Sequence, residues 1–172
     1  MELHFLAPDL RRLGSTTAEL VACSIWEDVR PMRGMAGLLD WRLAGKLSAL
    51  SRDGFLGGAR GEVLFVPGRP LLPFEKVLVL GLGPRSSFDE PAFKAVVLAL
   101  LKSLEGLHVR NAVVELPGRA EATIQAERAV ELLRECAGSS TAHDAWWLVE
   151  GPEAEKRLTL QNRDTRRREE RD

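Results

Sequence analysis

One short, uninterrupted apolar run constrains the fold of this chain more than any other feature. Residues 76–80 read Lys-Val-Leu-Val-Leu and lead directly into Gly81-Leu82-Gly83. A strand without polar alternation is typical of a sheet that is covered on both faces. From Glu62 onward the pattern predicts strand, strand, helix, strand, helix, strand, which requires crossover connections. We therefore expect an α/β fold of three α/β/α layers around a mostly parallel sheet.

The apolar periodicity gives approximate positions for the elements. Strands are expected at residues 3–8, 19–26, 62–67, 76–80, 109–116 and 145–149. Helices are expected at residues 35–50, 91–104 and 120–137. The strands near Glu62 and Lys76 are joined by a short loop rich in proline and glycine. That pair is expected to be antiparallel, which makes the central sheet mixed.

Length and charge limit the organisation and the partners. The 172 residues predict one domain over residues 1–150, followed by a charged tail over residues 151–172 that forms a frayed helix or is disordered. Lys and Arg total 24 against 25 for Asp and Glu, so the chain lacks the basic field that grips nucleic acid. DNA contact through Arg166, Arg167 and Arg168 is a lesser hypothesis, because acids are interleaved with this run.

The compartment is expected to be the cytoplasm. The start of the chain shows no signal peptide, and the longest apolar run, residues 95–101, is far shorter than the roughly 20 residues that a membrane span needs. Cys23 and Cys136 make neither a disulfide framework nor a zinc motif. The three histidines are scattered and no nucleophile motif occurs, so no catalytic residue, metal or cofactor is predicted.

Two glycine segments are candidates for ligand binding, Gly57-Gly58 in one loop and Gly81-Leu82-Gly83 after the buried strand. The second segment is placed like a dinucleotide fingerprint, but Ser86 stands where the third glycine should be. The first lacks the Gly-Lys-Ser/Thr ending of a phosphate loop. A tight turn and a flexible loop are the structural alternatives. Glu115 ends the next strand, where a ribose-binding acid could sit, but it lies rather far along the chain for that role.

A succession of short motifs resembles the N-terminal domain of the leucyl aminopeptidases. The motifs, in order over residues 19–149, are Trp-Glu-Asp-Val-Arg-Pro at 26–31, Gly-Leu-Leu-Asp at 37–40, Gly-Phe at 54–55, Gly-Glu at 61–62 and the strand ending Gly-Leu-Gly at 81–83. The resemblance implies a macro-domain-like sandwich that precedes a separate catalytic domain with two metal ions. Residues 153–160 resemble the family's metal-site signature, but Glu153 replaces an aspartate and Lys156 a glycine. Two carboxylates on a tail cannot hold a two-metal site, so no enzyme activity is expected.

Three functions remain open after this resemblance. The first is a stand-alone, non-catalytic module for protein interaction or oligomerisation, and the apolar residues proposed for its surface are Leu71, Leu72, Phe74, Trp146 and Trp147. The second is a small-ligand domain of nucleotide or ADP-ribose type that uses the two glycine segments, although the acids Glu27 and Asp28 would repel a pyrophosphate. The third is a subunit associated with aminopeptidase activity that another chain supplies.

Overall fold

Six strands form one mixed sheet in the computed structural model, which describes residues 1–138 and 140–169 except the side chains of residue 10 and residues 164–169. The strands are β1 (Glu2–Leu6), β2 (Leu20–Ile25), β3 (Val63–Pro67), β4 (Lys76–Gly81), β5 (Asn111–Val114) and β6 (Ala145–Val149). Their order in the sheet is β1-β6-β5-β2-β4-β3. Every described pair is parallel except β3 with β4, which confirms the expected mixed sheet.

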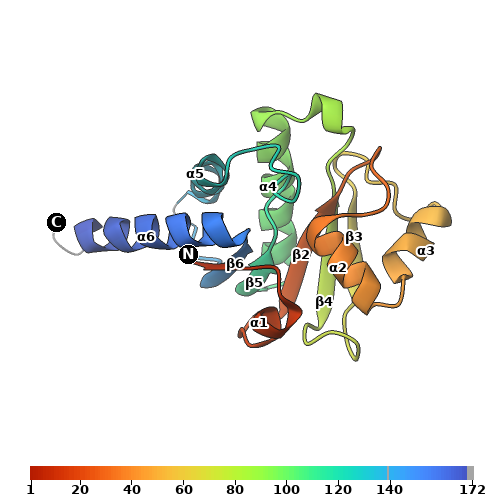
Figure 1. Ribbon diagram of the computed structural model, residues 1–172, viewed down its shortest axis with the longest axis horizontal. Coiled ribbons are helices and arrows are strands. Elements are labelled where there is room, and N and C mark those ends of the chain that lie inside the picture. The colour runs from red at the N-terminus through yellow and green to blue at the C-terminus, as the bar shows by residue number, and fades with distance from the viewer. Residues whose placement is uncertain (139, 170–172) are drawn as a thin grey trace.

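Helices cover both faces of the sheet and produce the three expected layers (Figure 1). One face carries α4 (Glu90–Gly106), α5 (Ala126–Ala137) and the start of α6 (Pro152–Glu169). The other carries α1 (Leu10–Gly14), α2 (Gly34–Arg42) and α3 (Lys46–Arg52). The strands divide their side chains between the two layers by ordinary alternation, so Ala22 and Val114 face α4 whereas Val21 and Val113 face α2.

The longest buried helix, α4, begins where its sequence predicts. The Asp89 carboxylate accepts a hydrogen bond from the Ala92 amide at 2.9 Å and caps the helix, and Pro91 lies in the first turn. Phe93, Val97 and Leu100 are fully buried against the sheet. A short 3-10 turn, η1 (Arg85–Ser87), connects β4 to this helix.

Two expected helices differ from the structure because the backbone turns left-handed inside them. The helix expected at 35–50 is split into α2 and α3, since Ala44 and Gly45 have φ angles of 56° and 78°. The helix expected from residue 120 begins only at Ala126, after Ala122 with a φ of 51°. In the opposite sense, residues 10–14, where no helix was expected, form α1, which buries Leu13 completely.

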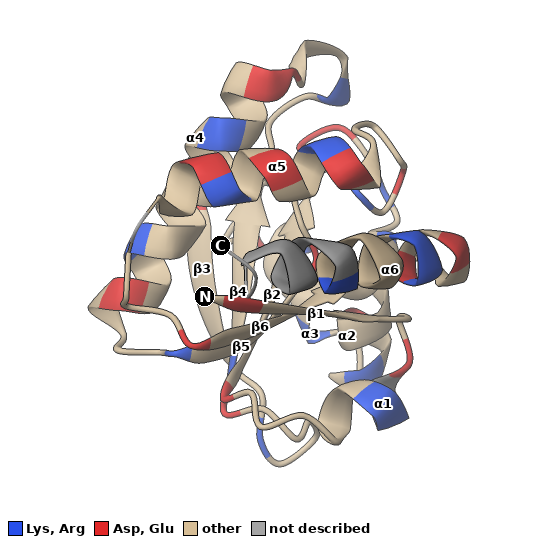
Figure 2. Ribbon diagram, turned by 90° about the vertical axis from the view of Figure 1, so that its left-hand side faces the viewer, with Lys and Arg blue, Asp and Glu red and all other residues tan. Residues whose placement is uncertain are grey.

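The segment expected as a tail begins with a packed helical turn. Ala154 and Leu158 of α6 are buried, and Arg12 near the start of the chain donates to Glu155 at 2.9 Å. The side chains of Arg166, Arg167 and Arg168 lie outside the described residues, as do residues 170–172. Figure 2 shows charges of both signs alternating along α5. No helix in the described part of the chain is long and apolar enough to cross a membrane.

Candidate functional site

The two glycine segments proposed for ligand binding lie against each other at the carboxyl end of β4. A Cβ atom on Gly81 would stand 2.0 Å from the carbonyl oxygen of Ala59 and 2.8 Å from the carbonyl carbon of Gly58. Only a glycine permits this approach of two backbones. The structure therefore brings the two segments together, and their contact is backbone packing.

The amide donors of these five residues are all used within the chain. The Gly57 and Gly58 amides both donate to the carboxylate of Glu62. The other three donate to carbonyl oxygens: Gly81 to Glu62 at 2.8 Å, Leu82 to Ile25 at 3.0 Å and Gly83 to Gly58 at 2.8 Å. A loop that cradles phosphate does so with free N–H groups. Here Glu62 fills the place of the anion.

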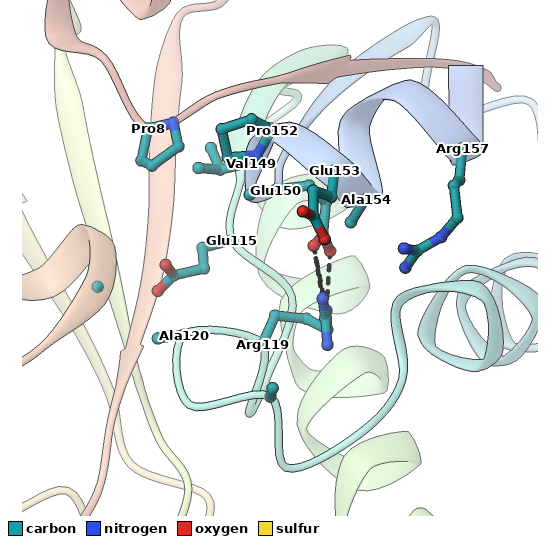
Figure 3. Close-up of a pocket in the computed structure, with 13 residues that line it drawn as sticks. Pro8, Glu115, Arg119, Ala120, Val149, Glu150, Pro152, Glu153, Ala154 and Arg157 are labelled. Atoms are coloured by element: carbon teal, nitrogen blue, oxygen red, sulfur yellow. Dashed lines mark hydrogen bonds and ion pairs between the residues drawn. The ribbon is translucent and has the colours of Figure 1, made fainter. Parts of the chain in front are cut away.

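A cavity of about 720 Å³ opens at the carboxyl ends of β5 and β6, beside the first turn of α6 (Figure 3). We call it the strand-end cavity, and its polar lining comes from Glu115, Arg119, Glu150, Glu153 and Arg157. Pro8, Ala120 and Val149 are among its apolar walls. Ligands of open α/β sheets commonly bind at this edge.

Glu115 occupies the amino-terminal end of α2 at one side of this cavity. Its carboxylate accepts a hydrogen bond from the Met35 amide at 3.0 Å, and the side chain is 7% exposed. The pKa of Glu115 is raised to about 8, mainly because the carboxyl group is buried. The charges of Glu121 and Glu150 also raise this pKa, whereas the hydrogen bond from Met35 lowers it. A helix amino terminus is a ready anion site, and this one is taken by the chain's own carboxyl group.

Arg119 and Glu150 form the most buried ion pair of the cavity. Arg119 donates to both Glu150 oxygens, with Nε–Oε1 at 2.9 Å and Nη2–Oε2 at 2.7 Å, and also to the carbonyl of Ile124. The side chains are 10% and 2% exposed. Figure 3 shows Arg119 reaching from the loop after β5 to Glu150, while Glu115 points away toward α2. The pair fastens that loop to the end of β6.

The predicted contact surface is mostly core, and this part of the prediction is corrected. Leu72, Phe74 and Trp146 are buried, and Trp147 is half-buried, with its ring stacked 5.3 Å from that of His4. Residues 71–74 alternate between exposed and buried positions. Leu72 and Phe74 point inward and pack in the same core cluster as α2, which fixes their loop to the core. Leu71 is the predicted residue that is well exposed, at 48%.

Leu71 lines a second cavity, of about 560 Å³, at the opposite end of α2. We call it the Trp41–Leu71 groove; its lining includes Arg11, Trp41, Arg42, Pro70, Leu71 and Pro73. Trp41 is 73% exposed, the largest value among the exposed large apolar side chains of the described residues. Neither Arg11 nor Arg42 has an ion-pair partner among residues with described side chains.

Sequence reasoning passed over Trp41, Arg119 and Glu150. Trp41 stands between Asp40 and Arg42 and off the apolar face of its helix, which is a readable signal of exposure. Glu150 follows a buried strand directly, as Glu115 does. Nothing in the spacing of Arg119 marks it as the partner of Glu150, 31 residues away.

Metal and nucleophile chemistry finds no support in the described part of the chain. No group of three or more His, Cys, Asp or Glu among the described residues is placed to hold a metal ion. Cys23 is fully buried, and burial together with the nearby Glu115 raises the pKa of its thiol well above the ordinary value. A thiol that stays protonated is a poor nucleophile.

Bacterial cytosol aminopeptidases match part of the chain. A probable cytosol aminopeptidase of Thioalkalivibrio sulfidiphilus is 29% identical over 100 residues, covering 56% of this chain and 20% of the relative. The cytosol aminopeptidase of Pseudomonas aeruginosa PAO1 is 29% identical over 114 residues, covering 66% of this chain and 23% of the relative. The chain thus spans about a fifth of the length of the curated relatives it matches.

Solved structures share the fold at low identity. A mutant of the Oceanobacillus iheyensis macrodomain has a TM-score of 0.71 at 9% identity, covering 96% of this chain and 89% of that chain. The Trypanosoma brucei macrodomain in complex with ADP has a TM-score of 0.66 at 14% identity, covering 90% and 65%. A mutant of tomato leucine aminopeptidase has a TM-score of 0.61 at 17% identity, covering 92% and 35%. The expected macro-domain-like fold is confirmed.

The family itself is shown by a model of the cytosol aminopeptidase family, N-terminal domain, which matches residues 25–138. This range includes α2, the glycine segments and Glu115. The match is confined to the N-terminal domain, and no catalytic domain is matched. By this match the chain belongs to the cytosol aminopeptidase family, as a representative of its N-terminal domain.

Proposed function

We propose that this chain acts as a non-catalytic protein-interaction domain and that the Trp41–Leu71 groove is its contact surface. The observation that carries the proposal is a tryptophan 73% exposed beside an exposed leucine and two arginines without ion-pair partners among the described side chains. Aromatic and arginine side chains supply most of the binding energy at protein interfaces. The matched residues 25–138 belong to the family's N-terminal domain, which supports a non-catalytic role for this part of the chain.

The lining of the groove defines the chemistry of the partner. Trp41, Leu71 and the two prolines offer apolar surface, and Arg11 and Arg42 offer two unmatched positive charges at its margin. A partner segment that alternates acidic and apolar side chains complements both the apolar surface and the two positive charges. A chain that supplies aminopeptidase activity is one partner that could present such a segment. The relatives named cytosol aminopeptidases favour the cytoplasm as the place of this interaction.

The groove proposal is tested by fluorescence anisotropy with a labelled peptide of alternating Glu and Leu. We expect saturable binding to the intact chain and at least about tenfold weaker binding to Trp41→Ser, because removing an interface anchor costs about 2 kcal/mol or more. Arg42→Glu should weaken the binding of the acidic peptide and strengthen the binding of a peptide of alternating Lys and Leu.

The matched control is Phe55→Ser, since Phe55 is also an exposed aromatic, at 67%, and does not line the groove. It should bind the acidic peptide as the intact chain does. Equal binding of both peptides, or equal loss in Trp41→Ser and Phe55→Ser, would contradict the proposal. Sedimentation that depends on protein concentration and is abolished by Trp41→Ser would instead identify a second copy as the occupant.

A nucleotide or ADP-ribose-type ligand is the second candidate. It is favoured by the likeness to macrodomain structures, one of which is in complex with ADP. The amide donors at the glycine segments and at Met35 are engaged by groups of the chain itself, which weighs against a pyrophosphate. We therefore rank it below protein interaction.

A further inference from the structure

His143, in the loop between α5 and β6, is a buried histidine whose ring nitrogens lack hydrogen-bond partners. The residue is 3% exposed, and its ring packs edge-on against Trp146, with the ring centroids 5.1 Å apart. Neither Nδ1 nor Nε2 of His143, nor Nε1 of Trp146, makes a hydrogen bond within the described part of the chain. A buried polar atom without a partner is costly, so this cluster is a weak point built into an otherwise apolar core.

Backbone hydrogen bonds of the residue after His143 tie this loop to two strands. The Asp144 amide donates to the Arg110 carbonyl at 3.0 Å, directly before β5. The Asp144 carbonyl accepts from the Glu2 amide at 2.7 Å, at the start of the edge strand β1. Because His143 adjoins both bonds, its ring cannot leave the core without loosening the corner where β1, β5 and β6 begin.

The charges around the ring do not compensate for its burial. Glu105 of α4 is the carboxylate beside it, but Oε1 lies 3.9 Å from His143 Nε2, beyond hydrogen-bond distance. The ionisable groups that face the ring are the Met1 amino group, Glu105, Arg110 and Asp144. Burial lowers the pKa of His143 below its ordinary value. The Val109 backbone and Glu105 oppose this change, whereas the positive charges of the amino group and Arg110 add to it.

We propose that His143 is an acid-sensitive latch, which holds the loop before β6 closed while its ring is neutral and lets this loop open when the ring takes up a proton. A neutral ring tolerates apolar surroundings better than an imidazolium, which carries a charge and two N–H donors. Among the described residues, no acceptor lies within hydrogen-bond distance of those donors. In the open loop, water solvates the charge.

The direction of the pH response follows from this difference between the closed and open loop. The open loop has the ordinary histidine pKa of about 6.5, and the closed loop has a lower pKa. The closed loop therefore has its full stability above about pH 6.5 and loses it as the pH falls toward the lowered pKa. The latch does not involve the Trp41–Leu71 groove, so either proposal can fail without the other.

Hydrogen exchange at pH 7.5 and pH 5.5, followed by mass spectrometry and corrected for the pH dependence of intrinsic exchange, tests the latch. We expect residues 140–149 to lose protection several-fold at the lower pH. The limit is about tenfold, because pH 5.5 lies about one pH unit below the pKa of the open form. Residues 76–81, which form β4, should keep their protection. An equal loss in both segments would show a general loss of stability and would overturn the proposal.

Variants of two histidines assign the response. His143→Phe keeps a ring against Trp146 but cannot take up a proton, so protection of residues 140–149 should not differ between the two pH values. His143→Gln is a second, smaller replacement with the same expected result. The matched control is His4→Phe, because His4 also contacts a tryptophan of β6, Trp147, but its side chain is 40% exposed. This control should respond to pH as the intact chain does.

Two further results would contradict the latch. The first is a pH response that survives in both His143→Phe and His143→Gln, which would place the titrating group elsewhere. The second is protection of residues 140–149 that rises at pH 5.5, which would show that Glu105 pairs with the protonated ring inside the closed loop.

Discussion

Replacing Arg119 with methionine is expected to lower the free energy of unfolding by about 3–5 kcal/mol, because it leaves a buried carboxylate without its partner. Glu150 is 2% exposed on its side chain, and Arg119 supplies the donors that its two oxygens accept. The loop after β5, which contains both Arg119 and Ile124, would also lose the hydrogen bond from Arg119 to the Ile124 carbonyl. Urea unfolding, followed by circular dichroism, measures the change.

The matched control for Arg119 is an ion pair of similar length on the surface. Arg110 and Asp144 lie 2.6 Å apart but are 52% and 53% exposed, so Arg110→Ala should change the free energy of unfolding far less than Arg119→Met does. The double variant Arg119→Met, Glu150→Leu removes both charges and should recover most of the lost stability. Equal losses for Arg119→Met and Arg110→Ala would show that burial does not govern the strength of this pair.

The second large effect is expected at Gly81. A Cβ atom there would stand 2.0 Å from the carbonyl oxygen of Ala59, and the obstacle is backbone rather than the end of a flexible side chain. Gly81→Ala must separate the loop at residues 57–59 from β4, so we expect a loss of about 3 kcal/mol or more. The same unfolding measurement applies.

Gly57→Ala is the control for Gly81, since both glycines belong to the predicted ligand segments. The nearest atom to a Cβ at Gly57 is 3.7 Å away and its φ is not left-handed, so the change should stay within about 0.5 kcal/mol. A stable Gly81→Ala, or a Gly57→Ala that is equally damaging, would refute the packing role assigned to Gly81.

The sequence predicted the sheet well because its strands are apolar runs with clear ends. The run at residues 76–80 forms β4, an interior strand between β2 and β3. The loop rich in proline and glycine before it joins β3 and β4 as the expected antiparallel pair. The helix breaks were missed because Ala44 and Ala122 adopt positive φ, which no propensity of alanine indicates. Boundaries of this kind depend on tertiary contacts.

The site was predicted less well, because its chemistry depends on long-range partners. Gly57, Gly58 and Gly81 to Gly83 do come together, but the sequence did not reveal that Glu62 and neighbouring carbonyls would use their donors. Trp146 was expected at a surface and is buried, whereas Trp41 was not considered and is exposed. Alternation along β6 places Trp146 and Trp147 on opposite faces, a distinction that composition alone cannot make.

Carboxyl groups of the chain itself, from Glu62 and Glu115, occupy the places where an anion would bind at the carboxyl edge of the sheet. Titration calorimetry with ADP and with ADP-ribose tests it most directly, with the Trypanosoma brucei macrodomain, known in complex with ADP, as the positive control. We predict no saturable heat for this chain at concentrations up to about 1 mM of either ligand. A micromolar Kd for ADP-ribose would show that these carboxyl groups do not block the anion positions.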